Sequence, residues 1–150
     1  MEPSQLQTFV SEFLNKLGAE VESLTVVTGH RTIVAVTAPA DSPLIGPGGD
    51  HLRSLNAIVK RMVEARHGDA AGAFLIDVNR HHESQMDTVR EQAQSLAQRV
   101  RLFKHDVEMP PLSAYERLVV HELFAEDPDI QTESAGEGKF RHIVLKYKNS

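Results

Sequence analysis

Four stretches of the chain carry apolar residues every three or four positions, which is the spacing of one buried helix face. The pattern predicts helices over residues 4–17, 52–67 and 80–104, and a fourth that starts after Ser113. Two prolines follow the third stretch and disfavour helix at the residues before them. We expect this long helix to bury one stripe, made of Met86, Val89, Ala93, Leu96, Ala97, Val100 and Phe103.

Residues with capping preferences mark three of the predicted helix ends. Ser4 with Gln7, and Ser113 with Glu116, fit the capping-box pattern, in which two side chains three positions apart bond each other's backbone N–H. Gly18 suits the left-handed position just past a last helical turn. These signals predict where the first helix begins and ends and where the last one begins.

Five short runs rich in β-branched residues predict strands between these helices. The first two, "VESLTVVT" and "RTIVAVTA", are separated by "GH", so we expect a hairpin. A very short helical turn is expected over "DSPLI", before the second helix. The predicted strands are residues 21–28, 31–38, 72–79, roughly 130–135 and 140–147.

The order of elements predicts an α+β protein of two domains. Residues 1–79 run helix, strand, strand, helix, strand, which gives an open α/β sandwich whose helices cover one sheet face. Residues 80–150 contain the long connecting helix and then a small helix packed on a hairpin. The boundary is expected between 80 and 105, with the long helix free to belong to either side.

Composition limits the class of protein. Of the 150 residues 41% are apolar, which is enough for a packed core, and none are cysteine. Disulfides, thiolate metal sites and cysteine nucleophiles are therefore excluded. No apolar segment approaches the roughly 20 residues that cross a bilayer, and the first residues do not resemble a signal peptide. We expect a cytoplasmic protein that does not insert into membranes.

The formal net charge of -5 argues against a protein that coats a polyanion through bulk attraction. Only residues 80–104 are basic, with 5 basic and 3 acidic side chains, whereas the segments on either side are acidic. Any nucleic-acid contact is therefore expected to be local.

A glycine-rich loop precedes the second helix. Glycines let another backbone approach closely, and the N–H groups at a helix N-terminus suit phosphate oxygens. The alternative for so short a G-x-x-G pattern is a plain helix-capping turn. Cations and a hydrogen-bond donor follow on the helix. The candidate residues are Gly46, Pro47, Gly48 and Gly49 in the loop, with His51, Arg53 and Lys60 beyond it.

Arg117 and His121 are four residues apart and so share one face of the last helix. Together they offer a small fork of hydrogen-bond donors for a phosphate. By spacing alone, the favoured interpretation is a surface arginine beside a satisfied histidine. No nucleophile pattern accompanies the pair, so we expect no enzymatic activity.

The first 79 residues resemble a type II KH domain, both in the order of their elements and in the G-x-x-G loop. In that family the loop clamps about four nucleotides of single-stranded RNA or DNA. The middle positions here, Pro47 and Gly48, carry no cation, and Pro47 has no N–H. The resemblance implies a backbone contact supported by the nearby basic residues.

The segment "PLSAYERLVVHELFAEDPDIQTESAGEGKFRHIVL" resembles an R-3-H domain, named for an arginine and a histidine separated by three residues. That motif falls on Arg117 and His121, and the second signature of the family falls on Ser134, Gly136 and Arg141. The resemblance implies binding of single-stranded nucleic acid by these five residues.

A KH domain followed by an R-3-H domain is the arrangement of the bacterial Jag proteins, also called KhpB or SpoIIIJ-associated proteins. The resemblance covers nearly the whole chain. It implies a cytoplasmic regulator that binds single-stranded RNA, or single-stranded DNA, and is linked to cell shape. Its partners in such a role are a small KH-only protein (KhpA-like) or a second copy of the chain.

Two other classes of function stay open at this point. A protein-interaction scaffold with little residual nucleic-acid affinity would suit the acidic balance and the surplus apolar surface of the 80–104 helix. A metal protein would have to use "RHHES", but adjacent residues on a helix point in different directions and do not easily share one metal. We interpret His81, His82 and Glu83 as a solvated helix start and expect neither metal nor cofactor.

Overall fold

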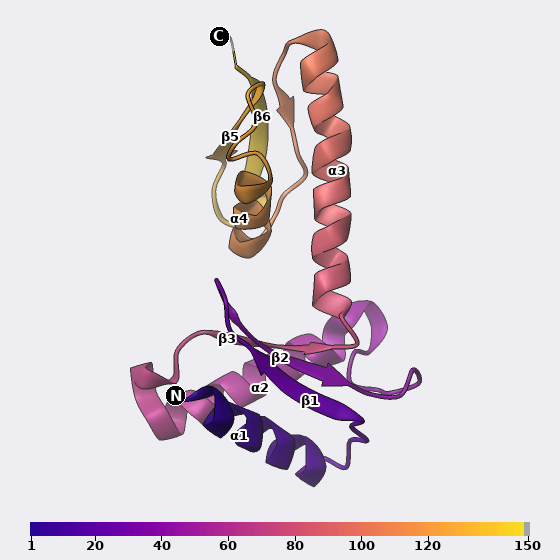
Figure 1. Ribbon diagram of the computed structural model, residues 1–150, viewed down its shortest axis with the longest axis vertical. Coiled ribbons are helices and arrows are strands. Elements are labelled where there is room, and N and C mark those ends of the chain that lie inside the picture. Colours follow the sequence, from indigo (N-terminus) through magenta and orange to yellow (C-terminus); the bar gives the residue numbers. More distant parts are fainter. Residues whose placement is uncertain (149–150) are drawn as a thin grey trace. The chain divides into compact units, whose positions relative to one another are not determined.

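The computed structural model describes residues 1–148, apart from the side chains at positions 70 and 71, and divides into two compact units (Figure 1). These are Met1–Glu83 and Ser84–Ser150, so the division lies near the start of the range 80–105. Each unit has its own apolar core, and each mixes helices with a three-stranded sheet. The expected α+β class is confirmed.

The first unit has the predicted helix, strand, strand, helix, strand order (Figure 1). Its sheet has the order β1-β2-β3, with β1 antiparallel and β3 parallel to the central strand. Residues from both helices and the sheet form one buried cluster, so the helices cover the same sheet face. The elements are α1 (Pro3–Lys16), β1 (Ser23–Val27), β2 (Thr32–Thr37), α2 (Asp50–His67) and β3 (Phe74–Val78).

The predicted capping box of α1 at Ser4 is wrong. Glu2 is the N-cap, and its backbone N–H donates to Oε1 of Gln5 at 3.1 Å. Pro3 then occupies the first helical position, where its missing N–H costs nothing. The other end is confirmed, because Gly18 follows the last turn with φ +81°.

Two polar side chains of the first unit join one element to another. Asn56 of α2 bonds Ile76 in both directions, accepting from its N–H at 2.7 Å and donating to its carbonyl at 2.9 Å. Asp77, although charged, is buried and accepts from the backbone N–H of His82 at 2.8 Å and of Glu83 at 3.3 Å. The first turn of the next helix is therefore held by β3.

The second unit packs helices on an antiparallel sheet of order β4-β6-β5. The capping box of Ser113 and Glu116 is confirmed, with the Glu116 N–H donating to Ser113 Oγ at 3.2 Å. The strand β4 is an addition that the sequence did not predict. The elements are α3 (His81–Phe103), β4 (Val107–Glu108), α4 (Ala114–Leu123), β5 (Ile130–Ala135) and β6 (His142–Tyr147).

The apolar stripe of α3 is confirmed except at its end. Met86, Val89, Ala93, Ala97 and Val100 are buried and Leu96 is half-buried, but Phe103 is 61% exposed. Phe103 lies in the last turn, beyond the residues that reach the core. Within residues 1–148, no helix is both long and apolar enough to cross a membrane.

Candidate nucleic-acid interface

The glycine loop of the first unit is a tight turn that leads directly into α2. Pro47–Gly49 form a short 3-10 turn, whereas the predicted helical turn over "DSPLI" is absent and residues 41–45 form non-helical turns instead. Gly46, Gly48 and Gly49 all have positive φ, at +72°, +59° and +80°. Side chains rarely adopt this region, which explains why the sequence uses glycine here.

Two of the loop's backbone donors are used inside the loop. The Gly49 N–H donates to the Gly46 carbonyl at 3.1 Å, and the Asp50 N–H donates to the carbonyl of Pro47. Pro47 itself has no N–H. A phosphate at this loop would therefore meet fewer N–H groups than a helix N-terminus usually offers.

The cation nearest the loop is held by the loop itself. Arg53 donates from Nη1 to the Gly48 carbonyl at 2.9 Å and forms an ion pair with Asp50 through Nη2. Both side chains of the pair are exposed. The negative charge of Asp50 offsets much of the positive charge that Arg53 would present to a ligand. Lys60 lies two turns further along α2 and is also exposed.

His51 packs against the loop rather than away from it. A Cβ on Gly46 would lie 2.3 Å from Cγ of the His51 ring, so only glycine fits there. The ring's Nδ1 lies 2.7 Å from the Pro43 carbonyl oxygen, which fixes Nδ1–H as the donor and directs Nε2 elsewhere. In the neutral ring Nε2 then carries no proton and can only accept, so the predicted role of His51 as a donor to a ligand requires the protonated imidazole.

His81 is a neighbour of the loop that the sequence did not reveal. Its Nε2 is buried and lies 3.0 Å from where a Cβ on Gly49 would be. Glu83 pairs with Arg80, and Nε2 of His82 is buried as well. The interpretation of "RHHES" as a solvated helix start is wrong at the histidines, because the end of β3 brings them back against the unit. Among the described residues, no three His, Asp or Glu side chains gather as metal ligands.

In the second unit, α4 places Arg117 and His121 on one face, as their spacing predicts. Arg117 is half-buried, and its Nη1 donates to the Leu112 carbonyl at 2.8 Å. This bond fixes the guanidinium in place while leaving further N–H donors on the fork. An arginine held in this way loses little conformational entropy when it binds an anion.

Both ring nitrogens of His121 lie within hydrogen-bond distance of hydroxyl groups on β5. Nδ1 is 2.6 Å from Thr132 Oγ1, and Nε2 is 3.1 Å from Ser134 Oγ. Burial lowers the pKa of His121, and the nearby Arg117 guanidinium lowers it further. The neutral imidazole therefore joins α4 to β5. Whether it also contacts a ligand stays a prediction, as does the role of Ser134.

Three basic residues of the second unit line one hollow of about 460 Å³. Arg117 lines it from α4, and Lys139 and Arg141 line it from the turn before β6. We call this hollow the basic pocket. Its wall is completed by residues around the start of α4 and by the turn itself, namely Pro111, Leu112, Ser113, Ala114 and Gly138.

The turn that carries the basic pocket is fixed by its own contacts. Nη1 of Arg141 donates to the Gly136 carbonyl at 2.8 Å, as Arg117 does to Leu112. Gly136 has φ +83°, and a Cβ on it would lie 3.0 Å from the Phe140 carbonyl oxygen. Gly136 is thus required by the turn, while Arg141 faces the pocket. Lys139 was not predicted, because a single exposed lysine carries no sequence pattern.

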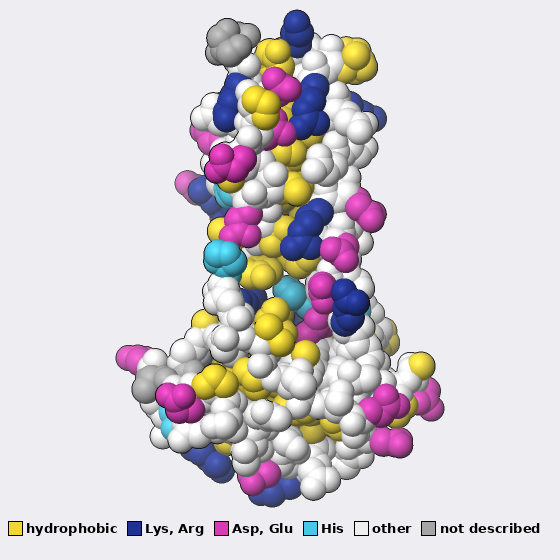
Figure 2. Space-filling model, viewed as in Figure 1, with side chains coloured by type: hydrophobic (Ala, Val, Ile, Leu, Met, Phe, Trp, Pro, Cys, Tyr) yellow, Lys and Arg dark blue, Asp and Glu magenta, His cyan; other side chains and the backbone are white. Residues whose placement is uncertain are grey.

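Charge is mixed on the face of the molecule shown in Figure 2. Figure 2 shows dark-blue Lys and Arg side chains interspersed with magenta Asp and Glu side chains on the visible face, with no broad basic patch. Attraction of a polyanion to this face by bulk charge would therefore be weak. The basic pocket is a local exception.

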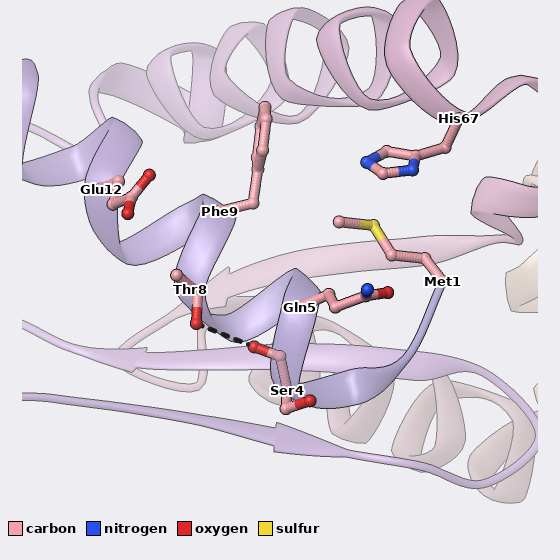
Figure 3. A pocket seen from close by; sticks show the side chains of 7 residues that line it. All are labelled: Met1, Ser4, Gln5, Thr8, Phe9, Glu12 and His67. Atoms are coloured by element: carbon pink, nitrogen blue, oxygen red, sulfur yellow. Dashed lines mark hydrogen bonds between the residues drawn. The ribbon is translucent and has the colours of Figure 1, made fainter.

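A second hollow, of about 360 Å³, lies beside α1 in the first unit. Figure 3 shows Met1, Phe9 and His67 directed into it. The hydrogen bond drawn there, from Thr8 Oγ1 to the Ser4 carbonyl, is internal to α1. This hollow brings no two cations together, and we assign it no function.

Comparison with known proteins matches the second unit to a domain family. Residues 87–147, which include every residue that lines the basic pocket, match the R-3-H domain family. The chain is 31% identical over 105 residues to the RNA-binding protein KhpB of Clostridium symbiosum, covering 70% of this chain and 47% of that protein. The chain is a homologue of the KhpB proteins and contains an R-3-H domain.

The KhpB of Bacillus subtilis (strain 168) is 26% identical over 146 residues, covering 95% of this chain and 67% of the relative. The KhpB of Lactiplantibacillus plantarum is 26% identical over 99 residues, covering 65% of this chain and 31% of the relative. The chain thus spans between about a third and two thirds of the length of these curated KhpB relatives. All three carry the name of an RNA-binding protein.

Proposed function

We propose that this chain binds single-stranded RNA and that its R-3-H unit holds a backbone phosphate in the basic pocket. The observation that carries the proposal is the convergence of Arg117, Lys139 and Arg141 on one hollow. Its location inside the R-3-H match, and the names of the KhpB relatives, support RNA as the ligand.

The chemistry of the basic pocket suits a phosphate diester. Two guanidiniums are already fixed on backbone carbonyls and can bond anionic oxygens in pairs, while the Lys139 ammonium adds a mobile charge. Ser113 and Ala114 place the N-terminus of α4 at the same hollow, where the helix dipole favours an anion. A single strand fits better than a duplex, because a chain with a formal net charge of -5 would not neutralise two phosphate backbones.

We extend the proposal to a second, weaker contact at the glycine loop of a KH-like first unit. The element order and the positive-φ glycines support it, while the Asp50–Arg53 pair and the inward N–H groups limit its strength. Two weak contacts on one chain raise the effective concentration wherever one strand reaches both. The residues proposed here are Gly46, Pro47, Gly48, Gly49, His51, Arg53 and Lys60.

The wider biological role rests on the resemblance of the whole chain to the KhpB relatives. It suggests a cytoplasmic regulator that acts on cell shape together with a small KH-only partner or a second copy of itself. Single-stranded DNA is the alternative ligand, since a phosphate pocket does not read the 2′-hydroxyl.

The test is a salt titration of binding to a short single-stranded RNA, measured by fluorescence anisotropy. For single strands, log K falls against log salt with a slope of about -0.7 per neutralised phosphate. Lys139→Ala should weaken binding and make this slope shallower by about 0.7. Arg117→Lys should weaken binding several-fold with an unchanged slope, because the charge stays and the fork is lost.

The matched control is Arg99→Ala, which removes an equal charge from an exposed position of α3 in the same unit. It should leave affinity and slope close to those of the unaltered protein. Equal effects of Lys139→Ala and Arg99→Ala would show that bulk charge, rather than the basic pocket, binds the strand. Absence of any binding by the unaltered protein would reject the proposal outright.

The second candidate is a protein-interaction scaffold, and one observation favours it. Leu102 is 73% exposed and Phe103 61% exposed at the end of α3, so adjacent apolar side chains face solvent. Such a pair can be covered by another protein. The absorbance ratio of the purified protein separates the two candidates, because co-purifying RNA raises the absorbance at 260 nm.

A further inference from the structure

Phe140 is an exposed aromatic residue in the turn that carries the basic pocket. Its side chain is 66% exposed, although burying a phenylalanine is strongly favourable. Its chain neighbours on both sides, Lys139 and Arg141, line the basic pocket. An aromatic ring between two cations at an anion site is a recurrent arrangement in proteins that bind single strands.

The backbone beneath this ring is held in place. The Phe140 N–H donates to the Glu137 carbonyl at 3.1 Å, and the Arg141 N–H donates to the Gly138 carbonyl at 3.2 Å. The Phe140 carbonyl in turn accepts from Nδ1 of His142 at 3.0 Å. The turn therefore presents the ring at a fixed place, and little backbone entropy remains to be lost on binding.

Lys139 shows that the ring and the basic pocket are adjacent. Its Nζ lies 5.3 Å from the centroid of the Phe140 ring, within cation–π range, and the same side chain lines the basic pocket. A ligand whose anionic group occupies the pocket thus brings the groups next to that anion close to the ring. In a nucleic-acid strand each phosphate is linked to sugars, and each sugar carries a base.

We infer that Phe140 stacks against a nucleobase of the strand whose phosphate occupies the basic pocket. This inference rests on the proposed function, which names contacts to a phosphate, and it adds a contact to a base. Every base has a π face, so the contact favours single strands with accessible bases and tolerates any sequence. A duplex keeps its bases stacked on each other and cannot offer one to the ring.

The surroundings favour a base over a protein surface as the occupant. A protein contact of useful strength buries a cluster of apolar side chains, whereas Phe140 stands between Lys139 and Arg141 with Gly138 beside them. Acidic side chains lie nearby as well: Glu137 is in the same turn, and Oε1 of Glu108 lies 3.5 Å from Nε2 of His142. The chain neighbours of the ring, Lys139 and Arg141, are both cationic, which complements a nucleotide.

The test compares the whole protein and its variants on two short strands of equal length, one an oligouridylate and the other an abasic strand with the same phosphates. Phe140→Ala should lower affinity for the oligouridylate on the order of tenfold and leave affinity for the abasic strand unchanged. Phe140→Tyr, which keeps the ring, should bind both strands like the unaltered protein. Lys139→Ala should weaken binding to both strands.

The matched control is Phe103→Ala, which removes an equally exposed phenylalanine that stacks on His105 in the same unit. It should leave the preference for the oligouridylate intact. If Phe140→Ala binds both strands like the unaltered protein, the stacking role is rejected while phosphate binding stands. If the unaltered protein binds neither strand, the proposed function itself has failed.

Discussion

The glycine loop and the basic pocket are both candidate phosphate sites, yet they differ in what happens to their cations. At the loop, Arg53 is paired with Asp50 and bonded to the Gly48 carbonyl, so much of its charge is already used. At the pocket, Arg117 donates to the Leu112 carbonyl and Arg141 donates to the Gly136 carbonyl. These acceptors are neutral, so both guanidiniums keep their net charge. A cation held by a neutral acceptor is positioned for a ligand, whereas one held by a carboxylate is partly neutralised.

The two regions also differ in how they are assembled. The loop and its arginine lie within eight consecutive residues, Gly46–Arg53, so its motif can be read from the chain. The pocket joins the start of α4 to the turn before β6, and only the fold brings these together. The site whose residues are contiguous in the chain is therefore the weaker candidate here. A motif shows which residues are near each other in the chain but not which charges remain available.

The largest expected effect concerns the glycines that shape the loop. Gly46→Ala should destabilise the first unit by about 3 kcal/mol, because the new Cβ meets the His51 ring and the residue keeps a positive φ. Gly48→Ala should cost only about 1 kcal/mol, since nothing lies within 4 Å of its Cβ position. Thermal unfolding of both variants measures the difference.

The double variant Gly46→Ala with His51→Ala separates the two causes. Removing the ring should recover most of the stability lost in Gly46→Ala. Only the cost of placing alanine at a positive φ should remain. A double variant as unstable as Gly46→Ala would show that the His51 ring does not set the glycine requirement.

The next effect concerns pH and the second unit. The pKa of His121 is lowered in the folded state, so folding favours the neutral imidazole. Its contribution to stability should be complete above the unfolded pKa of about 6.5 and be lost as pH falls from there toward the folded pKa. Melting temperatures at pH 8 and pH 5.5 should therefore show an acid-induced loss that His121→Gln lacks.

The variant is matched because glutamine keeps a donor and an acceptor for Thr132 and Ser134 but does not titrate. The other histidines are present in both proteins, so their titration cancels in the difference. An equal acid-induced loss in both proteins would place the pH sensitivity elsewhere. The result would mean that burial and the Arg117 guanidinium do not disfavour the charged form of His121.

Much of the fold could be predicted from local signals. Helical periodicity located four helices, and the Ser113 capping box gave the start of α4 because the cap depends only on residues three apart. The same logic failed at Ser4, where Glu2 lies close enough to compete for the cap and Pro3 suits the first turn. The strand β4 has two residues, too few for any periodic pattern.

The candidate sites were less predictable, for different physical reasons. The Asp50–Arg53 pair was visible as a spacing of three on a helix, so the neutralised loop cation could have been found from the sequence. Lys139 and Phe140 could not, because their importance depends on a turn folding beside α4. His81 reaches the loop only because β3 runs parallel to β2 and returns the chain there.

The smallest expected effect tests whether the acid at the loop is the cause of its weakness. Asp50→Asn keeps the size of the side chain but removes the charge opposite Arg53, so the loop should gain an effective cation. Surface ion pairs are worth about 0.2–1 kcal/mol, so we expect the affinity for a single-stranded RNA to rise by a factor of about two to five at low salt. The gain should vanish when Arg53→Ala is added, because the released guanidinium is its source. If Asp50→Asn binds like the unaltered protein at low salt, the loop does not contact the strand, and the basic pocket alone accounts for binding.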